Sequence, residues 1–169
     1  WGGVKRTVAN AYAPASPLPR LDFINYIKTK IDSNTIIGGD WNCVPDKTLD
    51  VQSKNPLGYA NRGSLLLSSC MSGHHLIDER REQLGNEPEY TRQGPTRPTG
   101  EITSTRLDVW YTPADLEPLQ TYYVDNSYIF KSTPSDHSAV RLELDNQRGE
   151  IGHERQTINE DLISDPGIQ

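Results

Sequence analysis

The stretch from Thr35 to Asn42 constrains the fold of this chain more than any other part of the sequence. Its isoleucine pair is followed by two glycines, a pattern typical of a buried strand whose end needs backbone freedom or a close approach. If the chain stays extended beyond the glycines, Asp40 and Asn42 share one face and Trp41 takes the other. A carboxylate beside a carboxamide suits phosphate ester hydrolysis, but Asp and Asn are also common turn residues after a strand.

The composition fits one domain whose overall charge does not attract nucleic acid. The chain has 169 residues and a formal net charge of -6, so any such binding depends on local basic groups or a metal. Cys43 and Cys70 have neither metal nor redox spacing, which favours reduced, structural thiols. No apolar run approaches a membrane span. Because the chain starts at Trp1 and its only methionine is Met71, we expect a piece of a longer protein.

The first 40 residues predict a strand, a helix and a second strand. Residues 4–12 carry β-branched side chains without a breaker, and Ser16–Pro17 supplies a helix cap followed by proline at the first helical position. Apolar residues then recur at helical spacing up to Ile31. Such a crossover implies a sheet with a helix on its face. Tyr12, at the end of the first strand, caps the core with its ring or offers its hydroxyl to a phosphate; from this residue alone we favour the core role.

The rest of the chain predicts one more helix and several strands. The helix runs from Ser64 to Gly73. A hairpin arm begins at residues 89–92, and residues 93–100 form a turn with local positive charge. Strands are predicted at 102–111, 122–130 and 139–144. From residue 145 onward the chain is polar and acidic, and we expect a linker.

An acid in the middle of the strand at 102–111 needs a partner. Asp108 lies among large apolar neighbours, where an unpaired carboxylate is unfavourable. Arg106, two residues earlier, is one candidate partner, and a histidine elsewhere is the other. Asp136 and His137 follow Pro134 and can both point inward only from a turn.

Four segments occur in order: Ala11–Tyr12–Ala13–Pro14, Gly38–Gly39–Asp40–Trp41–Asn42, Thr105–Arg106–Leu107–Asp108 and Ser135–Asp136–His137. Together they resemble the endonuclease/exonuclease/phosphatase superfamily, which includes exonuclease III-like AP endonucleases and deoxyribonuclease I. The Gly-Gly-Asp-x-Asn form and the arm at 90–92 are most similar to the endonuclease domain of non-LTR retrotransposon polyproteins. The residues from 152 to 168 more loosely resemble the stretch that joins this domain to a reverse transcriptase.

The resemblance implies a fold and a chemistry. The fold is a four-layer α/β/β/α sandwich of the deoxyribonuclease I-like type, with residues 1–144 as its C-terminal part and 145–169 as the linker. The activity is metal-dependent hydrolysis of phosphodiesters, above all DNA nicking, with Mg²⁺ (or Mn²⁺) at the strand ends. The partners are DNA and a reverse transcriptase domain of the same polyprotein, and not a membrane. The location is intracellular, and nuclear when the protein acts on DNA.

By position in the motifs, the resemblance also assigns roles to the catalytic residues. Asp40 positions or activates the attacking water, and Asn42 and Tyr12 contact the phosphate. His137 stabilises the charge of the transition state, and Asp108 orients the histidine.

Further residues are assigned to the metal and to DNA. Asp136 belongs to the metal and proton network. The predicted contacts to nucleic acid are made by Arg92, Arg97 and Arg106.

One departure from the family pattern bears on activity. The family carries an asparagine and a metal-binding glutamate well ahead of the matched tyrosine, whereas only eleven residues precede Tyr12. We therefore expect the N-terminal portion of the fold to be missing and the activity of this piece to be impaired. Two alternatives stay open. One is a phosphatase or phosphodiesterase of the same superfamily, and the other is a truncated remnant that binds DNA without catalysis.

Overall fold

The structure is a computed structural model that describes residues 4–94, 100–116, 118–124 and 135–144. The predicted linker at 145–169, Arg97 and the part of the 122–130 strand beyond Val124 lie outside the described residues. The elements are β1 (Thr7–Tyr12), α1 (Pro17–Lys28), β2 (Thr35–Asp40), β3 (Val51–Gln52), the 3-10 turn η1 (Pro56–Gly58), α2 (Ser64–Gly73), β4 (Leu76–Asp78), α3 (Glu79–Leu84), β5 (Arg92–Gln93), β6 (Ser104–Thr105), β7 (Asp108–Pro113), β8 (Pro118–Val124) and β9 (Ala139–Leu144).

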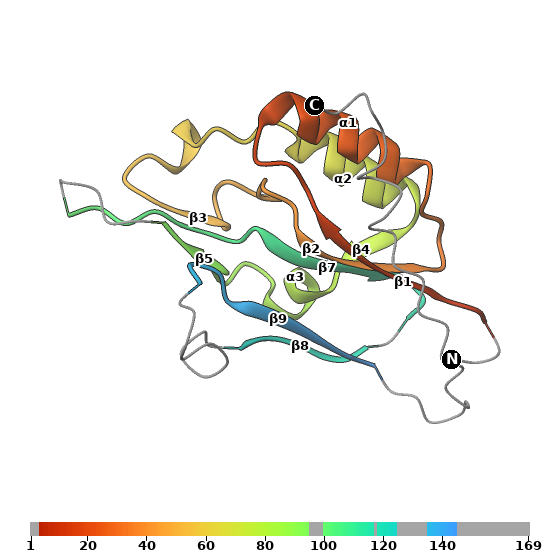
Figure 1. Cartoon of the computed structure of the whole chain (residues 1–169). Coiled ribbons are helices and arrows are strands. Elements are labelled where there is room, and N and C mark those ends of the chain that lie inside the picture. Colours follow the sequence, from red (N-terminus) through yellow and green to blue (C-terminus); the bar gives the residue numbers. More distant parts are fainter. Residues whose placement is uncertain (1–3, 95–99, 117, 125–134, 145–169) are drawn as a thin grey trace.

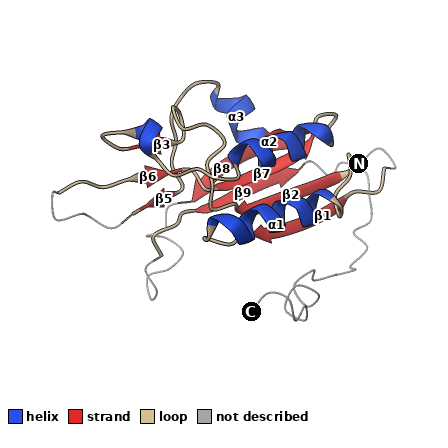
Figure 2. Ribbon diagram, turned by 90° about the horizontal axis from the view of Figure 1, so that it is seen from above, coloured by secondary structure: helices blue, strands red, loops and turns tan. Residues whose placement is uncertain are grey.

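A four-stranded mixed sheet in the order β1-β2-β7-β4 is the centre of the fold. β1 and β2 are parallel and joined by α1, which confirms the predicted strand–helix–strand unit. β7 runs antiparallel to both of its neighbours. Helices α1 and α2 cover one face of this sheet, and the β8–β9 pair lies on its other side (Figures 1 and 2). These layers place the carboxyl ends of β1 and β2 beside the start of β7.

The two predicted helices form where the sequence placed them. Helix α1 begins at Pro17 after an extended Ser16, although the Ser16 side chain caps no backbone amide among the described residues. Helix α2 spans Ser64–Gly73. The buried faces of both helices and the adjacent face of the sheet form one core cluster, whose members include Ile24, Ile27, Leu67, Met71 and Trp41. This core lies on the helix side of the sheet, opposite to the side on which the candidate site is found.

The single strand predicted at 102–111 is wrong, because the chain is split into β6 and β7. β6 belongs to a small sheet with β3 and β5, whereas β7 lies in the central sheet. Between them Arg106 is fully buried and forms ion pairs with Asp50 at 2.7 Å and Asp78 at 2.5 Å. A buried guanidinium needs such partners. Arg106 is therefore a structural residue and not the surface contact to DNA that the sequence suggested.

The paired glycines of β2 are required by close packing on both of them. Gly38 lies opposite Trp110 on β7, and a Cβ atom at Gly38 would lie 2.2 Å from the indole ring. Gly39 has a φ of 145°, and a Cβ atom there would lie 1.9 Å from the carbonyl oxygen of Ala11. The Trp110 indole also donates a hydrogen bond to the carbonyl oxygen of Val140 at 3.2 Å. Trp110 thus connects the central sheet to β9.

Candidate active site

Three strand-end residues form a row across the central sheet. Tyr12 pairs with Asp40 in the register of β1 and β2, and Asp40 pairs with Asp108 in the register of β2 and β7. Directly opposite residues on adjacent strands bring their side chains close together. The sheet register therefore places Tyr12, Asp40 and Asp108 side by side at one end of these strands, although they are far apart in the sequence.

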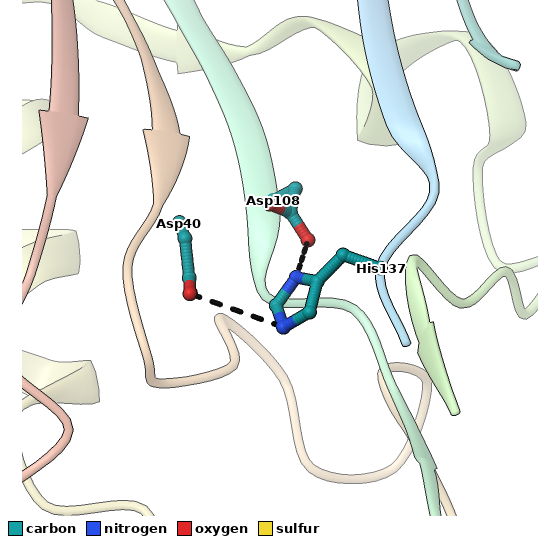
Figure 3. A group of neighbouring side chains, drawn as sticks. All are labelled: Asp40, Asp108 and His137. Atoms are coloured by element: carbon teal, nitrogen blue, oxygen red, sulfur yellow. Dashed lines mark hydrogen bonds and ion pairs between the residues drawn. The ribbon is translucent and has the colours of Figure 1, made fainter. Parts of the chain in front are cut away.

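His137 joins this row from the segment that precedes β9. Its Nδ1 atom lies 2.8 Å from a carboxylate oxygen of Asp108, so Nδ1–H donates to this oxygen. Its Nε2 atom lies 4.0 Å from Oδ2 of Asp40. Figure 3 shows the imidazole between the two carboxylates. Of the two partners predicted for Asp108, the structure shows the histidine and not Arg106.

The surroundings of this group shift the pKa values of two members. The hydrogen bond that His137 donates to Asp108 raises the pKa of His137, and it outweighs the opposing effect of burial. Burial raises the pKa of Asp40, with a smaller contribution in the same direction from the negative charge of Asp108. A histidine that favours its cationic form and a more basic carboxylate are suited to proton transfer and anion binding.

Asn42 lies beside Asp40, but not through the extended backbone that the sequence suggested. Its φ is 49°, in the left-handed region that asparagine tolerates. Its backbone amide donates to Oδ1 of Asp40 at 2.8 Å, and its side-chain amide donates to Oδ2 of Asp40 at 3.2 Å and to the carbonyl oxygen of Ala13 at 2.7 Å. Asn42 thus fixes the Asp40 carboxylate. Its contact with a phosphate stays a prediction.

Trp41 explains why the turn after β2 has a defined position. The indole is completely buried and donates to the carbonyl oxygen of Val109 at 3.2 Å. Its ring meets the Tyr111 ring edge to face at 5.7 Å. The turn that carries Asp40 and Asn42 is therefore anchored to β7, the strand that also carries Asp108.

Tyr12 is not the core residue that we favoured from the sequence. Tyr12 is 73% exposed, and Val8 and Asn10 on the same face of β1 are exposed as well. It lines a cavity of about 510 Å³ together with Asp40, Asp108 and His137. This leaves the second interpretation, in which the Tyr12 hydroxyl faces a ligand.

Asp136 and Arg92 form an ion pair at the rim of the site. The guanidinium donates to Oδ2 of Asp136 at 2.8 Å, and Oδ1 of Asp136 lies 4.0 Å from Nε2 of His137. Arg92 lies on the predicted hairpin, which the structure shows as β5 paired with β6. Arg97, the other arginine of the predicted hairpin, falls outside the described residues.

A possible metal site among the described residues consists of Asp40, Asp108 and His137. One ligand atom from each lies within 4.8 Å of the others. Carboxylate oxygens suit Mg²⁺ or Mn²⁺. The histidine is less suitable, since Nδ1 is bonded to Asp108 and a protonated Nε2 offers no lone pair. Asp136 is not part of this group.

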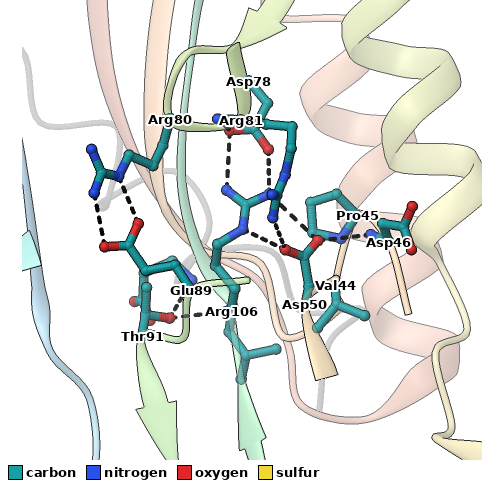
Figure 4. Close-up of polar contacts among 12 residues, drawn as sticks. Val44, Pro45, Asp46, Asp50, Asp78, Arg80, Arg81, Glu89, Thr91 and Arg106 are labelled. Carbon is teal, nitrogen blue, oxygen red and sulfur yellow. Dashed lines mark hydrogen bonds and ion pairs between the residues drawn. The ribbon is translucent and has the colours of Figure 1, made fainter. Parts of the chain in front are cut away.

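Sequence reasoning missed the charged network behind the site (Figure 4). Asp50 is completely buried and accepts hydrogen bonds from Arg106 and from Arg81, the latter at 2.5 Å. Asp78 caps the short helix α3 by accepting from the backbone amide of Arg81. The one signal in the sequence was an arginine within an apolar strand, and it did not reveal which acids would surround it.

Comparison with solved structures identifies the fold. The chain superposes on an AP endonuclease from Archaeoglobus fulgidus with a TM-score of 0.64 and 20% identity over 82% of this chain. It superposes on the endonuclease domain of TRAS1, a telomere-specific non-LTR retrotransposon, with a TM-score of 0.51 and 20% identity over 81% of this chain. The resemblance predicted from the four motifs is thus confirmed for the fold, which is that of AP endonucleases and deoxyribonuclease I.

The match covers only part of each neighbour. The chain spans 62% of the AP endonuclease and 56% of the TRAS1 domain. No protein-family model matches the chain, and no curated protein sequence does either. Within the described residues, no helix is long and apolar enough to cross a bilayer.

Proposed function

We propose that this chain is part of a metal-dependent endonuclease that nicks DNA, of the kind found in non-LTR retrotransposons. The observation that carries the proposal is the arrangement of His137 between Asp40 and Asp108 in one cavity. The fold of two known endonucleases and the order of the four motifs support it. We propose DNA as the substrate because both structural neighbours are endonucleases.

Asp40 acts on the attacking water. Its carboxylate is fixed by Asn42 and lies at the cavity, and burial raises its pKa. A carboxylate with a raised pKa accepts a proton more readily, so Asp40 can orient a water molecule and take its proton. Tyr12, next to Asp40 in the strand register, faces the same cavity and offers its hydroxyl to the phosphate.

His137 acts on the phosphate as a cation. Asp108 holds its Nδ1–H and raises its pKa, so Nε2–H points away from Asp108 and is free to donate. A phosphodiester gathers negative charge on its nonbridging oxygens at the transition state. A preorganised donor at that position therefore stabilises the transition state more than the ground state.

We propose Mg²⁺ as the metal, with Mn²⁺ as a substitute, held by the carboxylates of Asp40 and Asp108. Asp136 stays a proposed member of the metal and proton network. When bound, the cation would neutralise charge on the phosphate oxygens.

We further propose that nicking by this chain is slow, because the chain spans only 62% and 56% of two endonucleases of this fold, and the remainder of the fold is expected to supply a further metal-binding carboxylate. Since Mg²⁺ is typically held by only one or two carboxylates, the loss of one ligand would weaken its binding. A longer polypeptide that also contains the remainder of the matched fold should therefore nick faster.

The proposal also covers the contacts to DNA, the partner domain and the place in the cell where the protein works. The proposed contacts to the DNA backbone are made by Arg92, which lies on β5, and by Arg97 of the hairpin predicted from the sequence. They bring local positive charge to a chain of net charge -6. A reverse transcriptase in the same polyprotein would use the strand end at the nick as its primer. Such a protein works inside the cell, and in the nucleus when it acts on chromosomal DNA.

An assay with two substrates tests the activity. The chain is incubated with supercoiled plasmid and, separately, with an inositol phosphate, each with Mg²⁺, with Mn²⁺ and with a chelator. We expect slow nicking that requires the metal, and no release of phosphate. Phosphate release without nicking would identify a phosphatase, and DNA binding without nicking at any metal concentration would identify a binding remnant.

A further inference from the structure

At the break between β6 and β7, two backbone amides, one buried and one partly buried, are bonded by a side chain from another segment. They belong to Leu107 and Asp108, and both donate to the side-chain oxygen of Thr91, at 2.9 Å and 3.1 Å. Thr91 is only 1% exposed. A buried amide without an acceptor is costly, and this one oxygen accepts from both amides. One of these two amides belongs to Asp108, the residue that holds the catalytic histidine.

The backbone of Thr91 contacts the histidine segment as well. Its carbonyl oxygen accepts from the amide of Ser138 at 2.6 Å, next to His137. Its own amide donates to the carbonyl oxygen of Thr105 at 3.0 Å. Thr91 therefore bonds the start of β7 through its side chain and the segment before β9 through its backbone. Figure 4 shows Thr91 beside the chain at Arg106.

We propose that Thr91 is a positioning residue that sets the distance between Asp108 and His137. Asp108 and His137 come from segments 29 residues apart, and their side chains meet at 2.8 Å. The segment at Thr91 lies between their backbones and bonds both. If the side-chain oxygen is lost, Asp108 shifts while His137 stays in place. Only the expected effect of Thr91 on the nicking rate rests on the proposed function.

The chain offers a matched set of variants for the test. Thr91→Val keeps the shape of the side chain and removes its acceptor, whereas Thr91→Ser keeps the acceptor. Thr105→Val is the control, because Thr105 is equally buried in the neighbouring strand and its hydroxyl has no hydrogen-bond partner among the described residues. Thr91→Cys, with a weakly accepting sulfur, replaces Thr91→Val if that variant does not fold.

The decisive measurement is made on the free protein by NMR. The Nδ1 proton of His137 gives a far-downfield signal when it is bonded to Asp108, and His137→Asn identifies it. We expect Thr91→Val, or Thr91→Cys, to lose or shift this signal and the Leu107 and Asp108 amide signals. Thr91→Ser and Thr105→Val should keep them. An unchanged His137 signal in a folded Thr91→Val or Thr91→Cys protein would overturn the proposal.

Kinetics separate this inference from the proposed function. If the chain nicks DNA, Thr91→Val should lower kcat by up to roughly 100-fold with little change in KM, because a displacement of about 1 Å in a catalytic group can cost that much. Thr91→Ser should restore most of the rate. If no variant nicks DNA, the proposed function fails, and the NMR comparison still decides the role of Thr91.

Discussion

Asp40 and Asp108 lie directly opposite each other on antiparallel strands, and both carboxylates face the imidazole of His137. Two like charges this close are stabilised by a cation between them. His137, when protonated, is such a cation, and Arg92 adds a smaller effect of positive charge on Asp40. The charge state of His137 is therefore central to the site.

The first prediction concerns the pKa of His137. The hydrogen bond that His137 donates to Asp108 raises this pKa above its ordinary value of 6.5, so Asp108→Asn should lower it. Titration of the histidine ring signals by NMR measures both values, with His137→Asn identifying the resonance. The same pKa in both proteins would mean that the pair does not form in solution.

The raised pKa also predicts how stability depends on pH. A group whose pKa is higher in the folded state stabilises the fold fully below its unfolded value, near 6.5, and this stabilisation is lost as the pH rises through the folded pKa. The difference in unfolding free energy between the wild type and Asp108→Asn should therefore be largest at acidic pH. Urea unfolding at several pH values tests this, and a difference that grows toward alkaline pH would contradict it.

The second prediction concerns Gly38. Gly38→Ala places a methyl group against the Trp110 ring, where the ideal Cβ position is 2.2 Å away. Overpacking of this kind typically costs about 1–3 kcal/mol. Gly73→Ala is the control, since nothing lies within 4 Å of its Cβ position at the end of α2. Urea unfolding should show a loss for Gly38→Ala alone, and equal stability of the two variants would refute the packing.

The third prediction concerns Arg106. Arg106→Leu leaves Asp50 and Asp78 without their buried cation, and such a change costs about 3–5 kcal/mol. Adding Asp50→Asn and Asp78→Asn should restore part of the loss, because the unpaired charges are then removed. Urea unfolding of the single and triple variants measures both effects. A single variant as stable as the wild type would show that Arg106 is not the buried centre of this network.

The fourth prediction concerns the hairpin. Each phosphate contact that is lost should reduce the slope of log affinity against log salt by about 0.9. We expect a shallower slope for Arg92→Ala/Arg97→Ala, measured by titration of duplex DNA without divalent metal. Lys28→Ala, in the last turn of α1, is the control. A slope unchanged from the control would show that the hairpin does not contact DNA.

The elements that could be predicted are those with local signals. Helix α1 has a proline at its start and apolar residues at helical spacing, and β2 has an apolar run that ends in glycines. Four motifs that occur in order indicated which residues would lie together, and the sheet register explains why Tyr12, Asp40 and Asp108 meet. The catalytic roles of these residues stay predictions.

What the sequence could not predict depends on contacts between distant residues. The partners of Arg106 come from residues 50 and 78, so neither its burial nor the strand break beside it has a local signal. The exposure of Tyr12 depends on which layers cover β1. The role of Thr91 depends on two amides at the strand break, which its side chain bonds from another segment.

The most direct test of the account is plasmid nicking with Mg²⁺ and protein in excess, comparing Asp40→Ala and His137→Ala with the wild type. Asp22→Ala, an exposed acid on α1, is the matched control. The account predicts that each site variant lowers the nicking rate on the order of 10²–10³-fold, as is typical when one preorganised group at a developing charge is removed. The control should keep the wild-type rate. Wild-type nicking by Asp40→Ala or His137→Ala would contradict the assignment of the active site.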